Sequence, residues 1–408
     1  MAQPQGFVNP SAPGHVCLLQ KAIYGLNQSP RKWFETFSTY LLKFGFTHST
    51  ADPSLLLYHH NSIHIYILVY VDDILLTGNQ DPTIERLLLD LSNEFHMKNL
   101  GPVSYFLGIQ ITLTPDGLHL SQSSYARDLL TRAGMYDCKP ISSPSPTKVL
   151  SSSDRLLLPA EDEQFRHLVG SLQYLTITHP DISFTINKLC QHMHQPLEVD
   201  FKLLKQLLRY IKGTLLFGLP IRSGHLELFA YFDSDWAGDP VDRKSTSGYC
   251  AFLGDTLISW LFKKQKIVAR SSIEAEYRAL ATAATVLIWL RCLLAEFHLS
   301  TSQPKVLFCD NISTIALANN PIFHARTKHI EIDFHFIRDC IKNQVLKITH
   351  FYTNDQLADL FTKSLSIHRF SHLRNKLTLA EAPASLRGRI KQTTLSDVQQ
   401  TTIPVTKT

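Results

Sequence analysis

The order of the predicted elements between residues 226 and 365 constrains the fold most. Three strand-like segments, 226–232, 248–253 and 257–260, are joined by turn-forming stretches, and a long helical pattern follows over 273–298. Strands are then predicted at 305–309 and 345–352, and helices at 312–318, 329–342 and 355–365. Strands first, followed by alternation of helix and strand, predict a mixed β-sheet with helices packed on it.

Acidic residues stand where such a sheet builds a site. Asp233 and Asp310 end two strands, and Glu276 and Asp359 lie in neighbouring helices. Four converging carboxylates repel one another unless divalent cations neutralise them, and oxygen ligands select Mg²⁺ or Mn²⁺. Two such ions, about 4 Å apart, can activate a water and stabilise a leaving oxygen. The pattern therefore predicts metal-dependent hydrolysis of a phosphodiester.

Two of these acids also have ordinary structural interpretations. Aspartate often caps helices, and Asp310 stands directly before a predicted helix. Glu276 is equally compatible with a solvated position on its helix. Spacing alone leaves both interpretations open.

A second pair of acids interrupts a run of β-branched and aromatic residues. Residues 63–71 and 74–76 read as a hairpin with Asp72 and Asp73 at its tip, set against an apolar core. Turn chemistry is the alternative, because aspartate favours turns. Two-metal nucleotidyl transfer needs a further carboxylate on a neighbouring strand. The only acids upstream are Glu35, in a predicted helix, and Asp52, in a turn, so the hairpin is one acid short for polymerisation.

The rest of the first half is predicted as helices, a second hairpin and a Ser/Pro-rich linker. Helices are expected at 31–44, 83–95, 163–175, 182–194 and 199–211, a hairpin at 103–121 and the linker at 142–158. The 199–211 helix carries a basic stripe consisting of Lys202, Lys205, Arg209 and Lys212. A second basic cluster comprises Lys263, Lys264, Lys266 and Arg270. Basic groups so placed can neutralise nucleic-acid phosphates, but a solvated helix face explains the stripe equally well.

Composition narrows the class of protein. The chain has 408 residues, 44% of them apolar, and a net charge of +5, which fits a packed multidomain protein and permits a polyanionic partner. Seven single cysteines argue against a disulfide framework and favour a reducing compartment. We see no secretory signal, and the longest uninterrupted apolar stretches are too short to span a bilayer.

Several motifs together resemble a known family. The runs are YVDDILLTG at 70–78, AIYGLNQSPRKW at 22–33, FLGI at 106–109 and RYIKGT at 209–214. They resemble reverse transcriptases of the copia-type LTR retrotransposon class. The second half continues with DSDWAG at 233–238, SSIEAEY at 271–277, DN at 310–311, RTKHI at 326–330 and ADLFTK at 358–363. These resemble the RNase H domain of the same family, in order and at similar spacing.

The resemblance assigns roles to particular residues. It implies that Asp72 and Asp73 are polymerase carboxylates that bind metal, that Gln28 lies in the segment meeting template and nucleotide, and that 106–122 is a primer-gripping hairpin. Asp233, Glu276, Asp310 and Asp359 are implied as the RNase H metal ligands, with two Mg²⁺ or Mn²⁺ ions. Glu276 is preferred to Glu274, and Asp233 to Asp235.

Departures from the family pattern shape what we expect. The family's first catalytic palm strand would lie upstream of Met1, so we expect a truncated polymerase that is inactive alone. Protease and integrase signatures are absent. His179 replaces a usual arginine, and Leu261-Phe262 replaces small polar residues.

The expected architecture is α/β and α+β multidomain. A truncated reverse-transcriptase palm and thumb precede an RNase H-like mixed sheet with flanking helices. The expected boundaries are 1–141 for the partial palm, 142–224 for the linker and helical thumb, 225–368 for the RNase H-like domain and 369–408 for a partly disordered tail. A palm hairpin without its neighbouring strand would leave a sheet edge open.

The implied partners are an RNA–DNA hybrid and template–primer nucleic acid, with other Pol or Gag products as further associates and no membrane. The expected location is the cytoplasm, in virus-like particles, or the nucleus. His329 and His335 are candidates for proton transfer near the metals, although surface or packing roles are commoner for such histidines. The alternative functions are a catalytically silent remnant that binds nucleic acid, and a nuclease that uses the palm only for docking.

Overall fold

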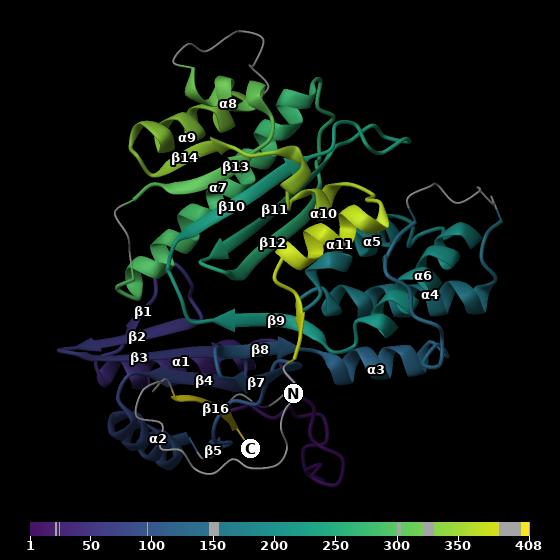
Figure 1. The fold of residues 1–408 in the computed structure, drawn as a ribbon. Helices are drawn as coiled ribbons and strands as arrows, with labels where there is room; N and C mark the ends of the chain where they lie inside the picture. The colour runs from purple at the N-terminus through teal and green to yellow at the C-terminus, as the bar shows by residue number, and fades with distance from the viewer. Residues whose placement is uncertain are drawn as a thin grey trace. The chain divides into compact units, whose positions relative to one another are not determined.

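The computed structural model describes residues 1–20, 23, 25–95, 97–146, 155–299, 303–320, 330–382 and 401–407. These residues, drawn as a ribbon in Figure 1, form two compact units. The first unit contains Met1–Val103 and Lys391–Thr408, and the second contains Ser104–Ile390.

The first unit is built on a six-stranded sheet with strand order β1-β2-β3-β4-β16-β5. Its strands are β1 (Thr47–His48), β2 (Leu55–His60), β3 (Ile63–Tyr70), β4 (Asp73–Gly78), β5 (Met97–Asn99) and β16 (Thr401–Lys407). Helices α1 (Ser29–Lys43) and α2 (Asp81–Phe95) bury Phe37, Leu41 and Leu87 against the apolar side chains of the sheet. The predicted hairpin and both predicted helices are confirmed.

The open sheet edge expected beside the hairpin is not open. Strand β16, from the predicted disordered tail, pairs antiparallel with β4 over 401–406 and with β5 over 405–407. Its backbone supplies partners for the N–H and C=O groups that an exposed β4 edge would present. The tail was expected to be partly disordered, and residues 401–407 are an ordered part of it.

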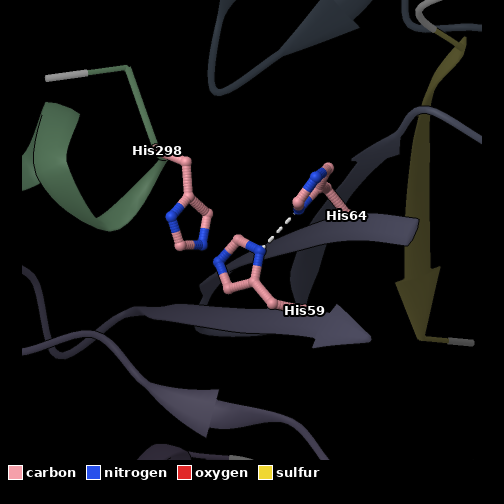
Figure 2. A group of neighbouring side chains, drawn as sticks. All are labelled: His59, His64 and His298. Carbon is pink, nitrogen blue, oxygen red and sulfur yellow. Dashed lines mark hydrogen bonds between the residues drawn. The ribbon is translucent and has the colours of Figure 1, made fainter. Parts of the chain in front are cut away.

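Two histidines face each other across β2 and β3. His59 and His64 are register partners, and their Nδ1 atoms lie 2.7 Å apart (Figure 2). Because a hydrogen bond between two such nitrogens needs one donor and one acceptor, the two rings take different proton arrangements.

The second unit contains the mixed sheet predicted from the sequence. Its strand order is β12-β11-β10-β13-β14, with β10, β11 and β12 antiparallel and β13 and β14 parallel to β10. The bounds are β10 (Leu228–Ser234), β11 (Thr246–Leu253), β12 (Thr256–Lys264), β13 (Lys305–Cys309) and β14 (Leu346–His350). The predicted fold class, a mixed sheet flanked by helices, is confirmed.

Both faces of this sheet are covered. Successive side chains of a strand point to opposite faces. On β11, Tyr249 and Ala251 join the core beneath α7 (Ser272–Glu296) and α9 (Glu331–Lys342). Cys250 and Phe252 join the opposite core, together with Leu360 and Phe361. Helix α8 (Ile312–Asn319) follows β13 and packs against α7 and α9.

Helix α7 lies along the sheet and contacts β10 and β11 (Figure 1). Within the described ranges it is long and apolar enough, by length and composition, to cross a membrane, a property that counting uninterrupted apolar runs missed. Its alanine-rich face is buried on the sheet, with Ala275, Ala279 and Ala283 at most 1% exposed. Packing in the core accounts for that composition.

A second sheet, with order β15-β9-β8-β7-β6, is part of the same unit. Its strands are β6 (Tyr105–Phe106), β7 (Ile109–Thr114), β8 (Gly117–Ser121), β9 (Phe217–Arg222) and β15 (Ala380–Glu381). The accompanying helices are α3 (Ser123–Arg132), α4 (Pro159–Leu175), α5 (Ser183–Gln191) and α6 (Glu198–Gly213). A short 3₁₀ turn, η1 (Pro180–Ile182), precedes α5.

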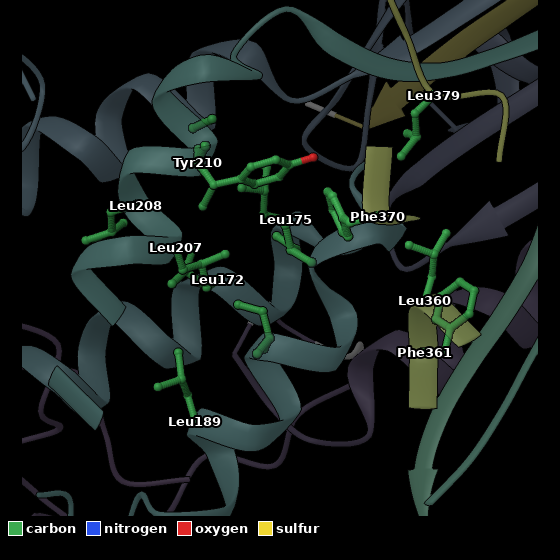
Figure 3. Packing of buried hydrophobic residues seen from close by; sticks show 14 of the residues in the cluster. Leu172, Leu175, Leu189, Leu207, Leu208, Tyr210, Leu360, Phe361, Phe370 and Leu379 are labelled. Atoms are coloured by element: carbon green, nitrogen blue, oxygen red, sulfur yellow. The ribbon is translucent and has the colours of Figure 1, made fainter. Parts of the chain in front are cut away.

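The helices α4–α6 share one core with the end of the chain. Figure 3 shows Leu172, Leu189 and Leu207 in the same cluster as Phe361 and Phe370. Helices α4–α6 therefore pack as one body with the C-terminal helices. The predicted domain boundaries stay predictions about functional modules.

Three local expectations differ from the structure. Helix α3 was not predicted, although Ala126, Leu129 and Leu130 form its buried face. The predicted 355–365 helix consists of a 3₁₀ turn, η3 (Thr353–Asp355), and a short helix, α10 (Asp359–Thr362). Residues assigned to the tail form α11 (Ile367–Lys376), whose Phe370 and Leu373 are buried in the core.

Gly248 sets how closely α10 approaches the sheet. It is the register partner of Asp233, and a Cβ atom there would lie 2.7 Å from Cβ of Phe361 and 3.0 Å from Cγ2 of Thr362. A side chain at this position would push α10 away from β11.

We expect Gly248→Ala to lower the free energy of unfolding by about 1–3 kcal/mol, the usual cost of overpacking. The control is Gly170→Ala in α4, where a Cβ meets nothing within 4 Å. Because alanine favours a helix, this change should raise the free energy of unfolding by about 0.5–1 kcal/mol. Urea unfolding of both variants measures the two effects. Equal effects would contradict the close approach of α10.

Candidate active site

Three carboxylates meet at one end of the mixed sheet. Asp233 ends β10, Asp310 follows β13, and Glu276 comes from the second turn of α7. One oxygen from each lies within 4.8 Å of the others. Because β10 and β13 are parallel neighbours, their carboxyl ends bring Asp233 and Asp310 to the same edge. The convergence predicted from the sequence is present for these three residues.

Glu276 is the most enclosed member of the three. It is 6% exposed, and its Oε2 is buried with no hydrogen-bond partner among the described residues. Burial, together with the neighbouring Asp233 and Asp310 carboxylates, raises the pKa of Glu276. A buried oxygen without a donor costs free energy, and a cation among these oxygens would remove that cost.

Asp359, the fourth predicted ligand, is engaged by side-chain cations. It is fully buried at the start of α10. Lys363 Nζ lies 2.6 Å from its Oδ1, and Arg369 donates to its Oδ2. Burial and the Asp233 carboxylate raise the pKa of Asp359 to about 6, although both cations act in the opposite direction.

Asp233 receives two further donors from the same segment. The Thr362 hydroxyl donates to its Oδ2, and Lys363 Nζ lies 2.9 Å from its Oδ1. Lys363 therefore bridges Asp233 and Asp359. Sequence reasoning missed the roles of Thr362, Lys363 and Arg369. The spacing of Asp359 and Lys363, four residues apart, was the available signal for one of these contacts.

The two rival acids have structural partners. Asp235 accepts the backbone N–H of Thr246, and burial raises its pKa to about 6. Glu274 binds Arg278 at 2.6 Å and accepts the N–H of Arg270 at 2.8 Å. This placement favours Asp233 and Glu276 as members of the carboxylate group.

In the first unit, Asp72 and Asp73 lie at the turn between β3 and β4. Val71, just before them, has a φ of 56°, which is strained for a β-branched residue. Asp72 is exposed and Asp73 half-buried, so the tip is more open than the expectation of acids set against a core. Burial, and then the Asp72 charge, raise the pKa of Asp73.

No described acid in the first unit completes a group of three ligands with this pair. Glu35 is paired with Arg31 and Lys32 on the surface of α1. Asp52 accepts from the backbone and hydroxyl of Ser54 in its turn. Both upstream acids have the structural roles predicted for them.

The basic stripe of α6 is partly occupied by intramolecular contacts. Lys202 pairs with Glu198 at 3.0 Å, and Lys205 lies 4.5 Å from the ring centre of Phe201. Arg209 donates to the Lys139 carbonyl at 2.8 Å, and Lys212 lies 4.1 Å from the ring centre of Tyr136. Lys202 and Lys205 are exposed, whereas Arg209 and Lys212 are half-buried.

The second basic cluster borders a groove of about 550 Å³ between β12, α7 and α9. Lys263 and Lys266 on its rim are exposed, whereas Lys264 is paired with Asp239 and with Asp242. Lys264 is therefore less available to a ligand than its neighbours.

The remaining candidates stay predictions. Gln28 is exposed at the start of α1, where its carbonyl accepts the N–H of Lys32. His335 is exposed on α9 with its ring against Phe334. His329 and the motif at 326–329 lie outside the described residues.

The chain is similar to known proteins over most of its length. Residues 1–147 match the family model described as reverse transcriptase (RNA-dependent DNA polymerase). The Pol polyprotein from transposon RE2 of Arabidopsis thaliana is 46% identical over 392 residues, which are 95% of this chain and 27% of that protein. The putative transposon Ty5-1 protein of Saccharomyces cerevisiae is 30% identical over 282 residues, 67% of this chain and 91% of that protein.

This chain thus spans about a quarter of the length of the RE2 polyprotein. Among solved structures, LC11-RNase H1 in complex with RNA/DNA hybrid is 13% identical, with a TM-score of 0.26. That match covers 33% of this chain and 94% of the LC11 chain.

The raised pKa of Asp359 predicts a pH dependence of stability in metal-free protein. A carboxyl that holds its proton more tightly when folded stabilises the fold below its ordinary pKa of 3.8. That contribution is lost as the pH rises through about 6. We subtract the unfolding free energy of Asp359→Asn from that of the natural chain. This difference should fall by up to about 3 kcal/mol from pH 4 to pH 7, because the natural chain alone loses the contribution.

Urea unfolding in EDTA at pH 4, 5, 6 and 7 measures this difference. Asp235 also has a pKa of about 6, but it is present in both proteins, so its contribution cancels from the difference. Parallel curves for the two proteins across this range would show that Asp359 titrates normally.

Proposed function

Because this chain belongs to the copia-type retrotransposon Pol family, we propose that its second unit is a divalent-metal-dependent ribonuclease. Its substrate is the RNA strand of an RNA–DNA hybrid. The observation that carries the proposal is the convergence of Asp233, Glu276 and Asp310 within 4.8 Å.

The donor set fits Mg²⁺ or Mn²⁺. All the candidate ligands are carboxylate oxygens, and Glu276 contributes a buried oxygen that has no donor within the described part of the chain. Asp233, Glu276 and Asp310 would hold one ion, and Asp359 with Asp233 a second. Bound metal would supply an activated water and stabilise the departing oxygen of the phosphodiester.

The chain's own residues prepare this chemistry. The Thr362 hydroxyl donates to one oxygen of Asp233, and Lys363 lies against the other, so the position of this carboxylate is restrained. The core beneath α7 holds Glu276 in place, because Ala275 and Tyr277 on either side of it are fully buried. Buried neighbours thus restrain Glu276 before substrate arrives, as positioned catalytic groups require.

Nucleic-acid binding is proposed to rest on the exposed lysines. Lys202, Lys205 and Lys263 are exposed, although Lys202 pairs with Glu198 and Lys205 lies over the Phe201 ring, whereas Arg209 and Lys264 are half-buried against their partners. Such contacts give salt-dependent affinity without reading bases. Contacts to the 2′-hydroxyl groups would distinguish the hybrid from duplex DNA.

The first unit is proposed as the polymerase portion of the module. Asp72 and Asp73 supply two carboxylates, and no third ligand joins them among the residues described there. We therefore expect this chain by itself to bind template–primer without extending the primer.

Mg²⁺-dependent cleavage of a labelled RNA–DNA hybrid tests the proposal directly. Asp310→Asn should lower the cleavage rate by about 100-fold or more, because it removes one of the metal-binding charges. The matched control is Asp339→Asn on the exposed side of α9, which should cleave at the natural rate. Cleavage that survives Asp310→Asn would point to a contaminating nuclease and reject the assignment.

Salt dependence tests the basic surface. The double change of Lys202 and Lys205 to Ala should reduce the slope of log affinity against log salt by about 0.9 for each phosphate that the protein no longer neutralises. Fluorescence anisotropy with labelled hybrid at 50–300 mM salt, roughly the range over which counterion release is resolved, provides the measurement. Lys347→Ala, on the exposed side of β14, is the control. An unchanged slope in the double variant would show that the lysines of α6 do not contact the phosphates of the hybrid.

A further inference from the structure

We propose that Lys363 is a displaceable counter-cation of the carboxylate cluster. In the metal-free protein its ammonium group holds Asp233 and Asp359 together, and it must withdraw before a divalent ion binds between them. This inference rests on the proposed function, since it assumes that the cluster binds metal.

The contacts of Lys363 support this role. Its Nζ lies 2.9 Å from Asp233 Oδ1 and 2.6 Å from Asp359 Oδ1, so one positive charge bridges two buried carboxylates. Each carboxylate side chain is 1% exposed, whereas the lysine side chain is 38% exposed. The ammonium group thus approaches the buried oxygens from the solvent side. A flexible four-carbon stem lets it return to solvent without movement of the backbone.

Arg369 and the pair Glu276 and Asp310 differ from Lys363 in their contacts. Arg369 also donates to Asp359, but a second bond of 2.7 Å to the Thr353 carbonyl anchors its guanidinium group. On the opposite side, Glu276 and Asp310 have no ion pair within the described ranges, and with Asp233 they form the group of three. Two of the three carboxylates at one metal position therefore have no ion pair in this part of the chain, whereas both carboxylates at the other are bridged by Lys363.

This asymmetry predicts an order of binding. A first ion among Asp233, Glu276 and Asp310 competes with Lys363 at Asp233 alone. An ion between Asp233 and Asp359 must compete with Lys363 for the same two oxygens. The second ion should therefore bind the free protein more weakly than the first, and removing the lysine charge should strengthen its binding.

The test is Mn²⁺ binding to the full chain, followed by the electron paramagnetic resonance signal of free Mn²⁺ and by calorimetry. The natural chain should bind one ion tightly and a second weakly. Lys363→Met and Lys363→Gln remove the charge, and we expect each to lower the dissociation constant of the second ion by about tenfold or more.

Lys376→Ala is the matched control. Lys376 pairs with Asp355 at the same 2.6 Å separation, and its side chain is 42% exposed, but it lies outside the cluster. This change should leave both Mn²⁺ constants unaltered. A general effect of protein charge on metal binding would move the control as well.

Thermal stability separates displacement from a merely structural ion pair. Lys363→Met should melt below the natural chain in EDTA, because two buried carboxylates lose their shared cation. Saturating Mn²⁺ should abolish that difference, because ligand binding stabilises only the state that holds it. A structural lysine would give the same loss with and without metal.

A measurement on the natural chain covers the case in which the variants do not fold. Acetylation of Lys363 by a lysine-reactive ester, followed by mass spectrometry, should be slow in EDTA and accelerate in Mn²⁺. The reactivity of Lys376 serves as the internal reference. Unchanged Lys363 reactivity would overturn the proposal.

The two levels of proposal fail separately. If the natural chain binds no Mn²⁺, or binds it independently of Asp310, the nuclease assignment fails. If Mn²⁺ binding requires Asp310 but the Lys363 variants bind it as the natural chain does, only the role of Lys363 is rejected.

Discussion

Repulsion among neighbouring carboxylates is the constraint on which the second unit depends. Asp233, Glu276 and Asp359 are each less than 9% exposed, and Asp310 stands beside them. Water cannot screen charges in such a place as it does on a surface, so they must be neutralised by protons or cations. The chain supplies Lys363 and Arg369 to one side of the cluster and leaves the other side without a side-chain cation in the described ranges.

The fold makes this concentration of charge possible by burying the sheet on both sides. Two separate cores cover β11, one under α7 and the other under α10 and the helices of the 142–224 region. Gly248 allows α10 to pack closely enough for Thr362 to reach Asp233. Apolar packing by residues far from the acids in the sequence thus offsets the free-energy cost of burying their charges.

Much of this arrangement follows from the sequence. The mixed sheet, the long helix and the convergence of Asp233, Glu276 and Asp310 were predictable, because parallel strands end at a common edge. The short helix α10 and the bridging contact of Lys363 were not. Asp233 and Lys363 are 130 residues apart, and no local pattern reports such a contact. The sequence likewise predicted the basic stripe of α6 but not the partners of Arg209 and Lys212.

The two groups of acids show why one sequence prediction can carry more information about function than another. Asp72 and Asp73 are adjacent in the sequence and stay together in any hairpin, so finding them together says little about the presence of a site. The members of the Asp233 cluster come from β10, α7, the end of β13 and α10, and only a folded core can assemble them. A cluster that costs repulsion and requires long-range packing is hard to explain as an accident of turn chemistry. We therefore place the proposed catalytic site in the second unit rather than at the hairpin of Asp72 and Asp73.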